Sequence, residues 1–265
     1  MKALVTGSGG FLGRHFVAEL ERRGWDAIGW ELADGHDAMH LFSTDVMLHL
    51  DLVVHCAAQG VYRVAIDGRP ATHIHNRMLD AAMFNWAIRT GARRVLYPSS
   101  CAVLDEQPDD YGLVKLAGER MAELARNTGL AVTVVRPYSG YGEDQGTDWP
   151  FGAFVARVKR RDDPVTVWGD GRQTRDWIHV DDIVNGALAA ADADITEPVS
   201  LCTGEGTSML RLVALLTMEA RYQPGIKFEL DAPAGKLQRV GDPTLMRTFY
   251  QPEVSLTEGV MRALA

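Results

Sequence analysis

Short apolar runs alternate with longer amphipathic stretches through the first half of the chain. Glycine or polar residues bound the apolar runs, as they do in buried strands, and five strands are predicted at 2–6, 26–30, 51–56, 94–99 and 131–136. Helical periodicity predicts helices at 10–23, 73–90 and 112–128, and a short one near 38–49. This alternation predicts an α/β fold, a doubly wound parallel sheet with helices on both faces.

The pattern changes after Pro137. The later chain predicts helices at 151–161, 181–192 and 208–222, strands at 165–168, 199–202 and 226–230, and two short helices at the end. Its irregular, loop-rich character is typical of a substrate-covering portion. We therefore predict a larger domain over 1–140, to which 177–203 returns, and a smaller C-terminal portion made of 141–176 and 204–265.

Composition narrows the possible partners and location. A net charge of −8 over 265 residues argues against a nucleic-acid or anionic-membrane partner, because either needs a basic face. Cys56, Cys101 and Cys202 lack paired spacing, so no disulfide framework or zinc ribbon is indicated. The first residues enter a strand without a signal-peptide core, and no apolar run has the length of a membrane span. We expect a soluble, cytoplasmic protein.

Three glycines follow the first predicted strand, in VTGSGGFLG. Gly7, Gly10 and Gly13 permit a tight turn and let a diphosphate approach the helix N-terminus. Glu31 ends the second strand, where a carboxylate accepts hydrogen bonds from both ribose hydroxyls and repels a 2′-phosphate. The pattern predicts an NAD site in preference to an NADP site. Asp37 is a candidate adenine ligand, with an exposed loop aspartate as the alternative.

A serine, a tyrosine and a lysine follow in SSCAVLDEQPDDYGLVK. Tyr111 and Lys115 are four residues apart and share a helix face, and Ser100 ends a parallel strand, where such folds bind ligands. A free tyrosine, with a pKa of about 10, is a poor base at neutral pH, and a nearby ammonium stabilises its phenolate. We interpret the three as catalytic residues; the alternative is a surface helix with a polar strand end.

Together these segments resemble the extended short-chain dehydrogenase/reductase family, in its NAD-dependent epimerase/dehydratase branch, which mostly acts on nucleotide sugars. The matching pieces occur in the family's order along nearly the whole chain. They are TGSGGFLG (6–13), HCAAQ (55–59), Asn76, SSCAVL (99–104), YGLVK (111–115), RPYSGYG (136–142), WGDGRQTRDWIHVDDIV (168–184) and LCTGEG (201–206).

The resemblance implies a Rossmann-type fold and assigns roles to individual residues. Tyr111 would be the acid/base, Lys115 its partner and ribose ligand, and Ser100 the partner of the reacting hydroxyl. The family usually has Val-Tyr where this chain has Val103-Leu104. Aligning on that pair makes Ser100, and not Ser99, the match to the family's catalytic serine. The implied cofactor contacts also include Phe11, Leu12, Ala57 and Ala58.

The substrate side of the site is also implied by the resemblance. Asn76 would shape the catalytic crevice or cap a helix. Arg175 and Arg239 would grip a substrate diphosphate, for which guanidinium groups suit, or form exposed ion pairs. His179, Asp181 and Asp182 match a structural strand-to-helix junction, so we assign no metal there, and we interpret the HIH at 73–75 in the same way.

The residues after Ser100 narrow the reaction. Family dehydratases carry an Asp-Glu pair and decarboxylases a Glu at the positions of Cys101-Ala102. A 4-epimerase needs no further acid, because the 4-keto sugar only has to turn and accept hydride on its other face. We therefore predict a nucleotide-sugar 4-epimerase, with a nucleotide-sugar dehydrogenase/reductase or a dehydratase of the same family as the alternative. A dinucleotide-binding scaffold without activity is a further alternative, which the presence of Tyr111 and Lys115 disfavours.

Two departures from the family concern the substrate, and one expectation concerns assembly. The segment between Ser100 and Tyr111 and the whole chain are short for the family, so a bulky or non-nucleotide substrate is possible. Family members commonly dimerise through the helices represented here by 73–90 and 112–128, and we expect a homodimer. Apolar residues there that serve either the interface or the core are Met78, Met83, Trp86, Leu116 and Met121.

Overall fold

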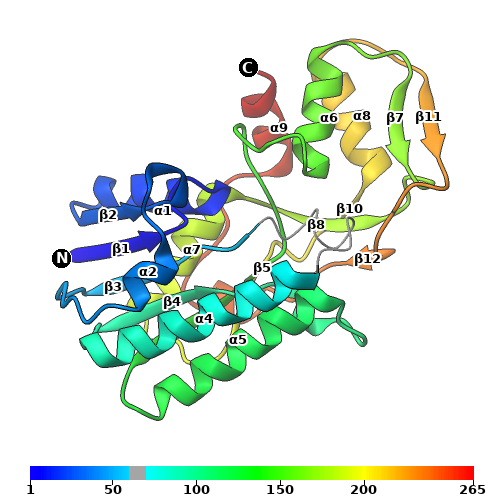
Figure 1. The fold of residues 1–265 in the computed structure, drawn as a ribbon. Helices are drawn as coiled ribbons and strands as arrows, with labels where there is room; N and C mark the ends of the chain where they lie inside the picture. The colour runs from blue at the N-terminus through cyan, green and yellow to red at the C-terminus, as the bar shows by residue number, and fades with distance from the viewer. Residues whose placement is uncertain (60–69) are drawn as a thin grey trace. The chain divides into compact units, whose positions relative to one another are not determined.

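The computed structural model describes residues 1–59 and 70–265 (Figure 1). The chain divides into two compact units. The first comprises Met1–Pro137 and Val184–Val199, and the second comprises Tyr138–Ile183 and Ser200–Ala265.

A six-stranded sheet forms the centre of the first unit, in the order β2-β1-β3-β4-β5-β9. The strands are β1 (Lys2–Thr6), β2 (Asp26–Trp30), β3 (Leu52–His55), β4 (Arg94–Pro98), β5 (Ala131–Pro137) and β9 (Val199–Leu201). The pairs β1–β2, β1–β3, β3–β4 and β4–β5 are all parallel. The five apolar runs of the first half therefore form five of the six strands, as the hydrophobic pattern predicts, and β9 from the later chain adds the sixth.

The strand order places helices on both faces of this sheet. The helices are α1 (Phe11–Arg22), α2 (Ala38–Phe42), α4 (Pro70–Thr90), α5 (Asp110–Arg126) and α7 (Val180–Asp192). The chain moves one way along the sheet from β1 to β2 and the other way from β3 to β4. Crossovers between parallel strands are right-handed as a rule, which puts α1 and α4 on opposite faces, as Figure 1 shows. The strand order thus reverses between β1 and β3, and ligands of open parallel sheets bind at the carboxyl ends of strands beside such a point.

One apolar core lies between the sheet and the helices α2, α4 and α5, and α4 and α5 run side by side (Figure 1). Met83 and Trp86 are fully buried in it. Met121 packs against it, whereas Met78 and Leu116 are exposed. The helix expected near 38–49 begins where predicted, with Asp37 as its cap, but it ends at Phe42.

The second unit contains two smaller sheets and a separate core. Its strands β6 (Ser139–Tyr141), β8 (Thr174–His179), β10 (Gly206–Ser208) and β12 (Gln238–Arg239) form one sheet, and β7 (Val165–Trp168) pairs with β11 (Ile226–Glu229). The helices are α6 (Pro150–Lys159), α8 (Met209–Glu219) and α9 (Leu256–Leu264). The hydrophobic pattern did not predict β6, β8, β10 or β12. These strands are short or, like β8, carry charged residues whose burial depends on distant partners.

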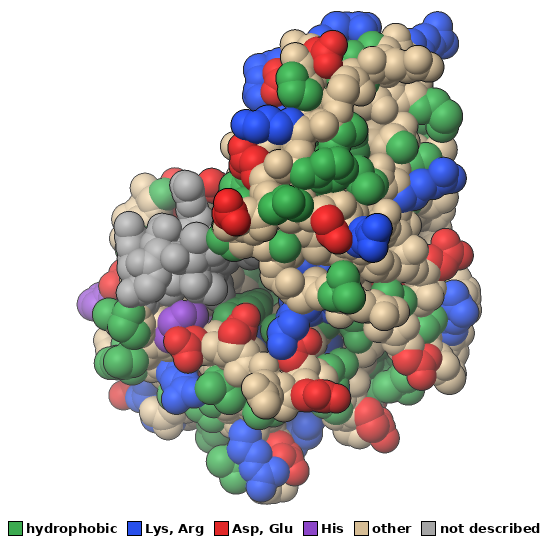
Figure 2. Space-filling view, turned by 90° about the vertical axis from the view of Figure 1, so that its right-hand side faces the viewer, with side chains coloured by type: hydrophobic (Ala, Val, Ile, Leu, Met, Phe, Trp, Pro, Cys, Tyr) green, Lys and Arg blue, Asp and Glu red, His purple; other side chains and the backbone are tan. Residues whose placement is uncertain are grey.

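The face of the molecule in Figure 2 is neither predominantly basic nor predominantly acidic. Lys and Arg side chains are interspersed there with Asp and Glu side chains. No helix among the described residues is long and apolar enough to cross a membrane.

Candidate active site

The glycine loop lies between β1 and α1 and contacts the segment that follows β3. Gly7 has a φ of +67°, and a Cβ there would lie 2.7 Å from the backbone N and Cα of Ala57. A Cβ at Gly13 would overlap the carbonyl oxygen of Gly7. The first turn of α1 includes Phe11 and Leu12, and Gly10 before it has no side chain to cap the helix. The loop therefore presents backbone amides at a helix N-terminus, which suits an anion.

Glu31 stands beside this loop at the end of β2. Its Oε2 accepts the Gly9 N–H at 2.8 Å, and its Oε1 accepts the Ala33 N–H at 3.4 Å. The acidic side chain thus lies next to the glycine loop, where it can also accept hydroxyl groups of a ribose. Asp37 is engaged locally, because its Oδ1 accepts the Met39 N–H at 2.8 Å as the cap of α2. Its contact with adenine stays a prediction.

Asn76 fixes the segment after β3 that carries Ala57 and Ala58. Its Oδ1 accepts the Gln59 N–H at 2.8 Å, and its Nδ2 donates to the Gln59 carbonyl at 3.2 Å. Asn76 is 4% exposed. Both ends of the amide are used by the backbone of Gln59, so Asn76 ties α4 to the segment after β3. Its role in shaping the catalytic crevice stays a prediction.

Ser100 follows the carboxyl end of β4 and caps a short 3-10 helix. Its Oγ accepts the Ala102 N–H at 3.2 Å. The start of α5 packs directly on this turn, because a Cβ at Gly112 would lie 2.9 Å from the Ala102 carbonyl oxygen. Tyr111, half-buried, is the residue before Gly112. The turn that holds Ser100 and the helix end that holds Tyr111 are therefore in contact.

Lys115 is attached to the same strand end from α5. Its Nζ donates to the Pro98 carbonyl oxygen at 2.9 Å and lies 4.9 Å from the centre of the Tyr97 ring. It stands one helical turn after Tyr111, on the same face of α5. The predicted trio is thus assembled around the carboxyl end of β4.

A buried ion pair that the sequence analysis missed secures this arrangement. Arg136, on β5, donates to Glu119, on α5, through Nε at 2.8 Å and Nη2 at 2.5 Å, and the Ser99 hydroxyl donates to the same carboxylate at 2.5 Å. The Glu119 side chain is 8% exposed. The pair joins α5 to the ends of β4 and β5. The sequence offered one signal for this ion pair, namely Glu119, an acidic residue in the middle of a predicted amphipathic helix.

The second unit brings the two predicted arginines together. Arg239 on β12 is in register with Arg175 on the neighbouring parallel strand β8. Arg175 Nη1 donates to the carbonyl oxygens of Thr174 and Lys236 at 2.9 and 2.7 Å. The adjacent Asp176 is fully buried, and its carboxylate accepts the backbone N–H groups of Thr203, Gly204 and Gly241 at 2.8–3.2 Å.

The strand-to-helix junction after β8 has a structural role. Asp182 is 1% exposed and accepts the Tyr250 hydroxyl and the backbone N–H groups of Glu253 and Val254 at 2.7–3.0 Å. His179 lies 3.3 Å from both Glu143 Oε2 and Asp181 Oδ2. Within residues 1–59 and 70–265, no group of three or more His, Cys, Asp or Glu side chains could hold a metal ion.

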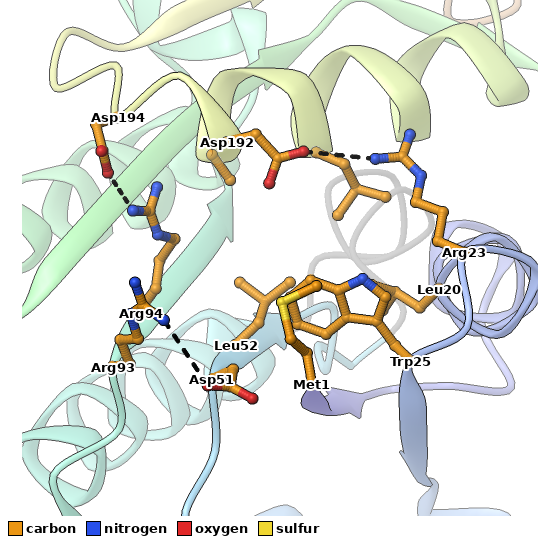
Figure 3. Close-up of a pocket in the computed structure, with 12 residues that line it drawn as sticks. Met1, Leu20, Arg23, Trp25, Asp51, Leu52, Arg93, Arg94, Asp192 and Asp194 are labelled. Carbon is orange, nitrogen blue, oxygen red and sulfur yellow. Dashed lines mark hydrogen bonds and ion pairs between the residues drawn. The ribbon is translucent and has the colours of Figure 1, made fainter.

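A cavity of about 190 Å³ lies in the first unit at the opposite, amino ends of the strands (Figure 3). Arginines and aspartates surround its apolar floor and pair with one another: Arg23 with Asp192, Arg94 with Asp194, and Arg93 with Asp51. It shares no residue with the glycine loop or the Ser100, Tyr111 and Lys115 cluster.

The family model described as "NAD dependent epimerase/dehydratase family" matches residues 3–201. The chain belongs to this family. The match spans the glycine loop, the Tyr111 and Lys115 pair and β8 with Arg175, whereas Arg239 on β12 lies beyond it.

Relatives of this epimerase/dehydratase family member carry out different reactions. One is dTDP-4-dehydro-6-deoxy-D-allose reductase of Streptomyces bikiniensis, 26% identical over 92% of this chain and 88% of its own length. Another is GDP-mannose 3,5-epimerase 1 of Oryza sativa subsp. indica, 25% identical over 98% and 80%. UDP-glucuronic acid decarboxylase 1 of Arabidopsis thaliana is 27% identical over 100% and 69%.

Solved structures of the same fold are similar over the whole chain. UDP-glucose 4-epimerase of Thermotoga maritima, solved with UDP-glucose, is 25% identical with a TM-score of 0.85, covering 100% of this chain and 97% of that chain. A UDP-glucuronic acid 4-epimerase mutant of Bacillus cereus, solved with its NAD and a fluorinated sugar nucleotide, is 23% identical with a TM-score of 0.86, covering 100% and 98%. The Rossmann-type α/β fold is thereby confirmed.

NAD is the cofactor of the family, and the residues of this epimerase/dehydratase family member fit it. Gly7 and Gly13 let the loop pack closely against backbone atoms and lead into the α1 N-terminus, whose amides suit a diphosphate. Glu31 supplies a carboxylate at the end of β2 for the ribose hydroxyls. Lys115 supplies an ammonium at the end of β4.

Proposed function

We propose that this protein is an NAD-dependent 4-epimerase of nucleotide sugars. One observation carries the choice of reaction: the two residues after Ser100 are Cys101 and Ala102, which are 5% and 1% exposed inside a 3-10 turn. The turn thus places no acidic side chain after Ser100. A dehydration or decarboxylation that relied on an acid at this point has no group to use.

The proposed mechanism uses three residues of the first unit. Ser100 accepts or donates a hydrogen bond at the reacting sugar hydroxyl and orients it. Tyr111 removes the hydroxyl proton and later returns it, and Lys115 stabilises the phenolate and binds the cofactor's ribose. NAD, which the glycine loop, Glu31 and Lys115 would hold, would supply a reversible hydride acceptor for carbon 4 of the sugar.

In the second unit, Arg175 and Arg239 are the proposed ligands of the substrate diphosphate. Their in-register position on neighbouring strands gives two adjacent guanidinium groups, and guanidinium pairs suit a diphosphate. The substrate-binding portion proposed for 141–176 and 204–265 contains both.

The proposed assembly is a homodimer through α4 and α5. Both helices carry exposed apolar side chains, namely Ile74, Met78, Leu113, Leu116 and Leu124. Sedimentation should show a dimer that Leu116→Lys dissociates.

The three cysteines, all within the described residues, form no disulfide, which supports a reducing compartment such as the cytoplasm.

The test is to incubate the protein with NAD⁺ and a panel of UDP-, GDP- and dTDP-sugars and to follow inversion at carbon 4 by NMR. Internal return of hydride predicts product without deuterium at carbon 4 in D₂O, whereas inversion by exchange next to a keto group would incorporate deuterium. Tyr111→Phe should abolish turnover. Tyr222→Phe, which removes a phenol elsewhere in the chain, should not. No inversion with any sugar would refute the 4-epimerase.

A second candidate is a 4-keto sugar reductase, which the similarity to the Streptomyces bikiniensis reductase favours. It would consume NADH in proportion to product, whereas a 4-epimerase consumes none. Glu31 disfavours a reductase that depends on NADPH. Tight NAD binding with no turnover in either assay would support a scaffold without activity.

A further inference from the structure

The first unit contains a buried carboxylate that the mechanism above does not use. Asp80 lies in the middle of α4 and is 3% exposed. Tyr97, on β4, donates its hydroxyl to Asp80 Oδ2 at 2.6 Å, and His55 Nε2, at the end of β3, lies 3.2 Å from Oδ1. Burying a carboxylate is costly unless hydrogen bonds and an opposite charge compensate it.

Lys115 is part of that compensation. Its ammonium lies over the face of the Tyr97 ring, whose hydroxyl bonds Asp80, so the ring stands between the two charged groups. Burial by itself would raise the pKa of Asp80, but its contact with His55 and the positive charge of Lys115 outweigh burial and lower it. Asp80 is therefore an anion that helps to balance Lys115.

The packing of α5 fits this arrangement. A Cβ at Gly118 would overlap the Tyr97 hydroxyl and lie 2.9 Å from its ring carbon Cε1. Gly118 stands three residues after Lys115, on the same side of the helix. One face of α5 therefore leaves space for the phenol and places the ammonium over its ring.

The contacts continue from Asp80 to the glycine loop. His55 Nδ1 lies 2.9 Å from Thr6 Oγ1, and Thr6 is the last residue of β1, directly before Gly7. A buried line of side chains thus joins the end of β1 to Lys115.

We propose that Asp80 is a positioning residue that, together with Tyr97, holds the Lys115 ammonium charged and in place at the carboxyl end of β4. The inference deepens the proposed function. It rests on that function only for the part that Lys115 takes in the reaction. Asp80 itself touches neither substrate nor cofactor in this proposal.

Other titratable and charged groups lie on the described strands β3, β4 and β5 and on α5 itself. They are His55 on β3 and Cys56 directly after it, Tyr97 on β4, Arg136 on β5, and Tyr111 and Glu119 on α5. Burial raises the pKa of the Cys56 thiol to about 12, so it carries no charge at neutral pH. Glu119 is paired with Arg136. Asp80 is thus the carboxylate whose removal should change Lys115 most.

The experiment measures the reactivity of the Lys115 amine, which needs no substrate. Trace acetic anhydride acetylates neutral amines, and mass spectrometry reports the rate at each of the five lysines across a range of pH. Exposed Lys159 is the internal standard. Asp80→Asn keeps the shape and an acceptor for Tyr97 but removes the charge. We expect Lys115 to react about tenfold faster at pH 8, with its profile moved about one pH unit lower.

Two further variants make the result specific. Tyr97→Phe removes the hydrogen bond and keeps the charge, so it should shift the Lys115 profile in the same direction by less. Thr90→Val removes another buried polar group of α4, whose hydroxyl donates to the Trp86 carbonyl at 2.8 Å, and should leave the profile unchanged. Thermal unfolding checks that each variant is folded.

An unchanged Lys115 profile in folded Asp80→Asn protein would overturn the proposal. If Asp80→Asn fails to fold, an unchanged profile in Tyr97→Phe overturns it equally. A profile shift in Thr90→Val as large as in the other two would also overturn it, because general loosening of α4 would then explain the effect. Since labelling requires no turnover, failure of the 4-epimerase assay leaves this test intact.

Discussion

Replacing Gly13 by alanine tests whether the close packing of the glycine loop creates the cofactor site. The new Cβ would overlap the Gly7 carbonyl oxygen and lie 2.8 Å from the Gly7 carbonyl carbon and 2.9 Å from Ser8 Cα. Carbon atoms in good contact are about 3.5–4.0 Å apart, so the closest carbon pair has to separate by at least about 0.7 Å.

Neither side of this contact can move freely. Gly7 is itself pressed against the backbone of Ala57, and Phe16 and Leu20 anchor α1 in the core with no exposed surface. Overpacking of this kind costs about 1–3 kcal/mol, and the better helix propensity of alanine returns at most about 1 kcal/mol. We expect Gly13→Ala to lose about 1–2 kcal/mol of unfolding free energy. A displaced loop should also weaken NAD binding at least tenfold, which corresponds to about 1.4 kcal/mol.

Urea unfolding and calorimetric titration with NAD⁺ measure the two effects. Gly146→Ala is the matched control, because a Cβ at Gly146 would meet nothing within 4 Å. Wild-type NAD affinity and stability in Gly13→Ala would refute the reasoning that the tight loop forms the anion site.

Three further predictions concern other polar groups. Glu31→Ser should weaken NAD binding and relax discrimination against NADP, measured as the ratio of the two dissociation constants; an unchanged ratio would contradict the assigned role. Glu119→Gln should cost about 3–5 kcal/mol in urea unfolding, because it leaves Arg136 buried without its anion, and a loss below 1 kcal/mol would contradict this. Burial lowers the pKa of His179, but the carboxylates of Asp181 and Glu143 outweigh burial and raise it. This charge therefore stabilises the fold fully below the unfolded pKa of about 6.5 and stops doing so as pH rises through the folded pKa. Thermal unfolding across pH should show that loss in the wild type and not in His179→Gln.

Features that depend on local pattern were predictable from the sequence. The five strands of the first half have near-continuous apolar runs, and α1, α4 and α5 have helical periodicity, so neighbours in the chain suffice to specify them. The glycine loop is similarly local, because positive φ and close backbone contact require glycine whatever surrounds it. Tyr111 and Lys115 share a helix face by spacing alone.

The predictions that failed or were missing depend on partners far away in the chain. Strand β8 contains Arg175 and Asp176 and looked polar, yet Asp176 is fully buried because backbone N–H groups of residues 203, 204 and 241 satisfy its carboxylate. A periodicity analysis counts such a residue as exposed, since it contains no information on distant hydrogen-bond donors.

The sequence by itself determined the order of strands and helices in the first half of the chain, the glycine loop and the residue types of the proposed catalytic trio. Only the tertiary structure decided which buried charges support them. Asp80 belongs to an ordinary helical pattern, and nothing adjacent to it in the chain reveals Tyr97 or His55 as partners. The physical reason is that the cost of burying a charge depends on the groups that folding brings to it, which lie on other strands and helices.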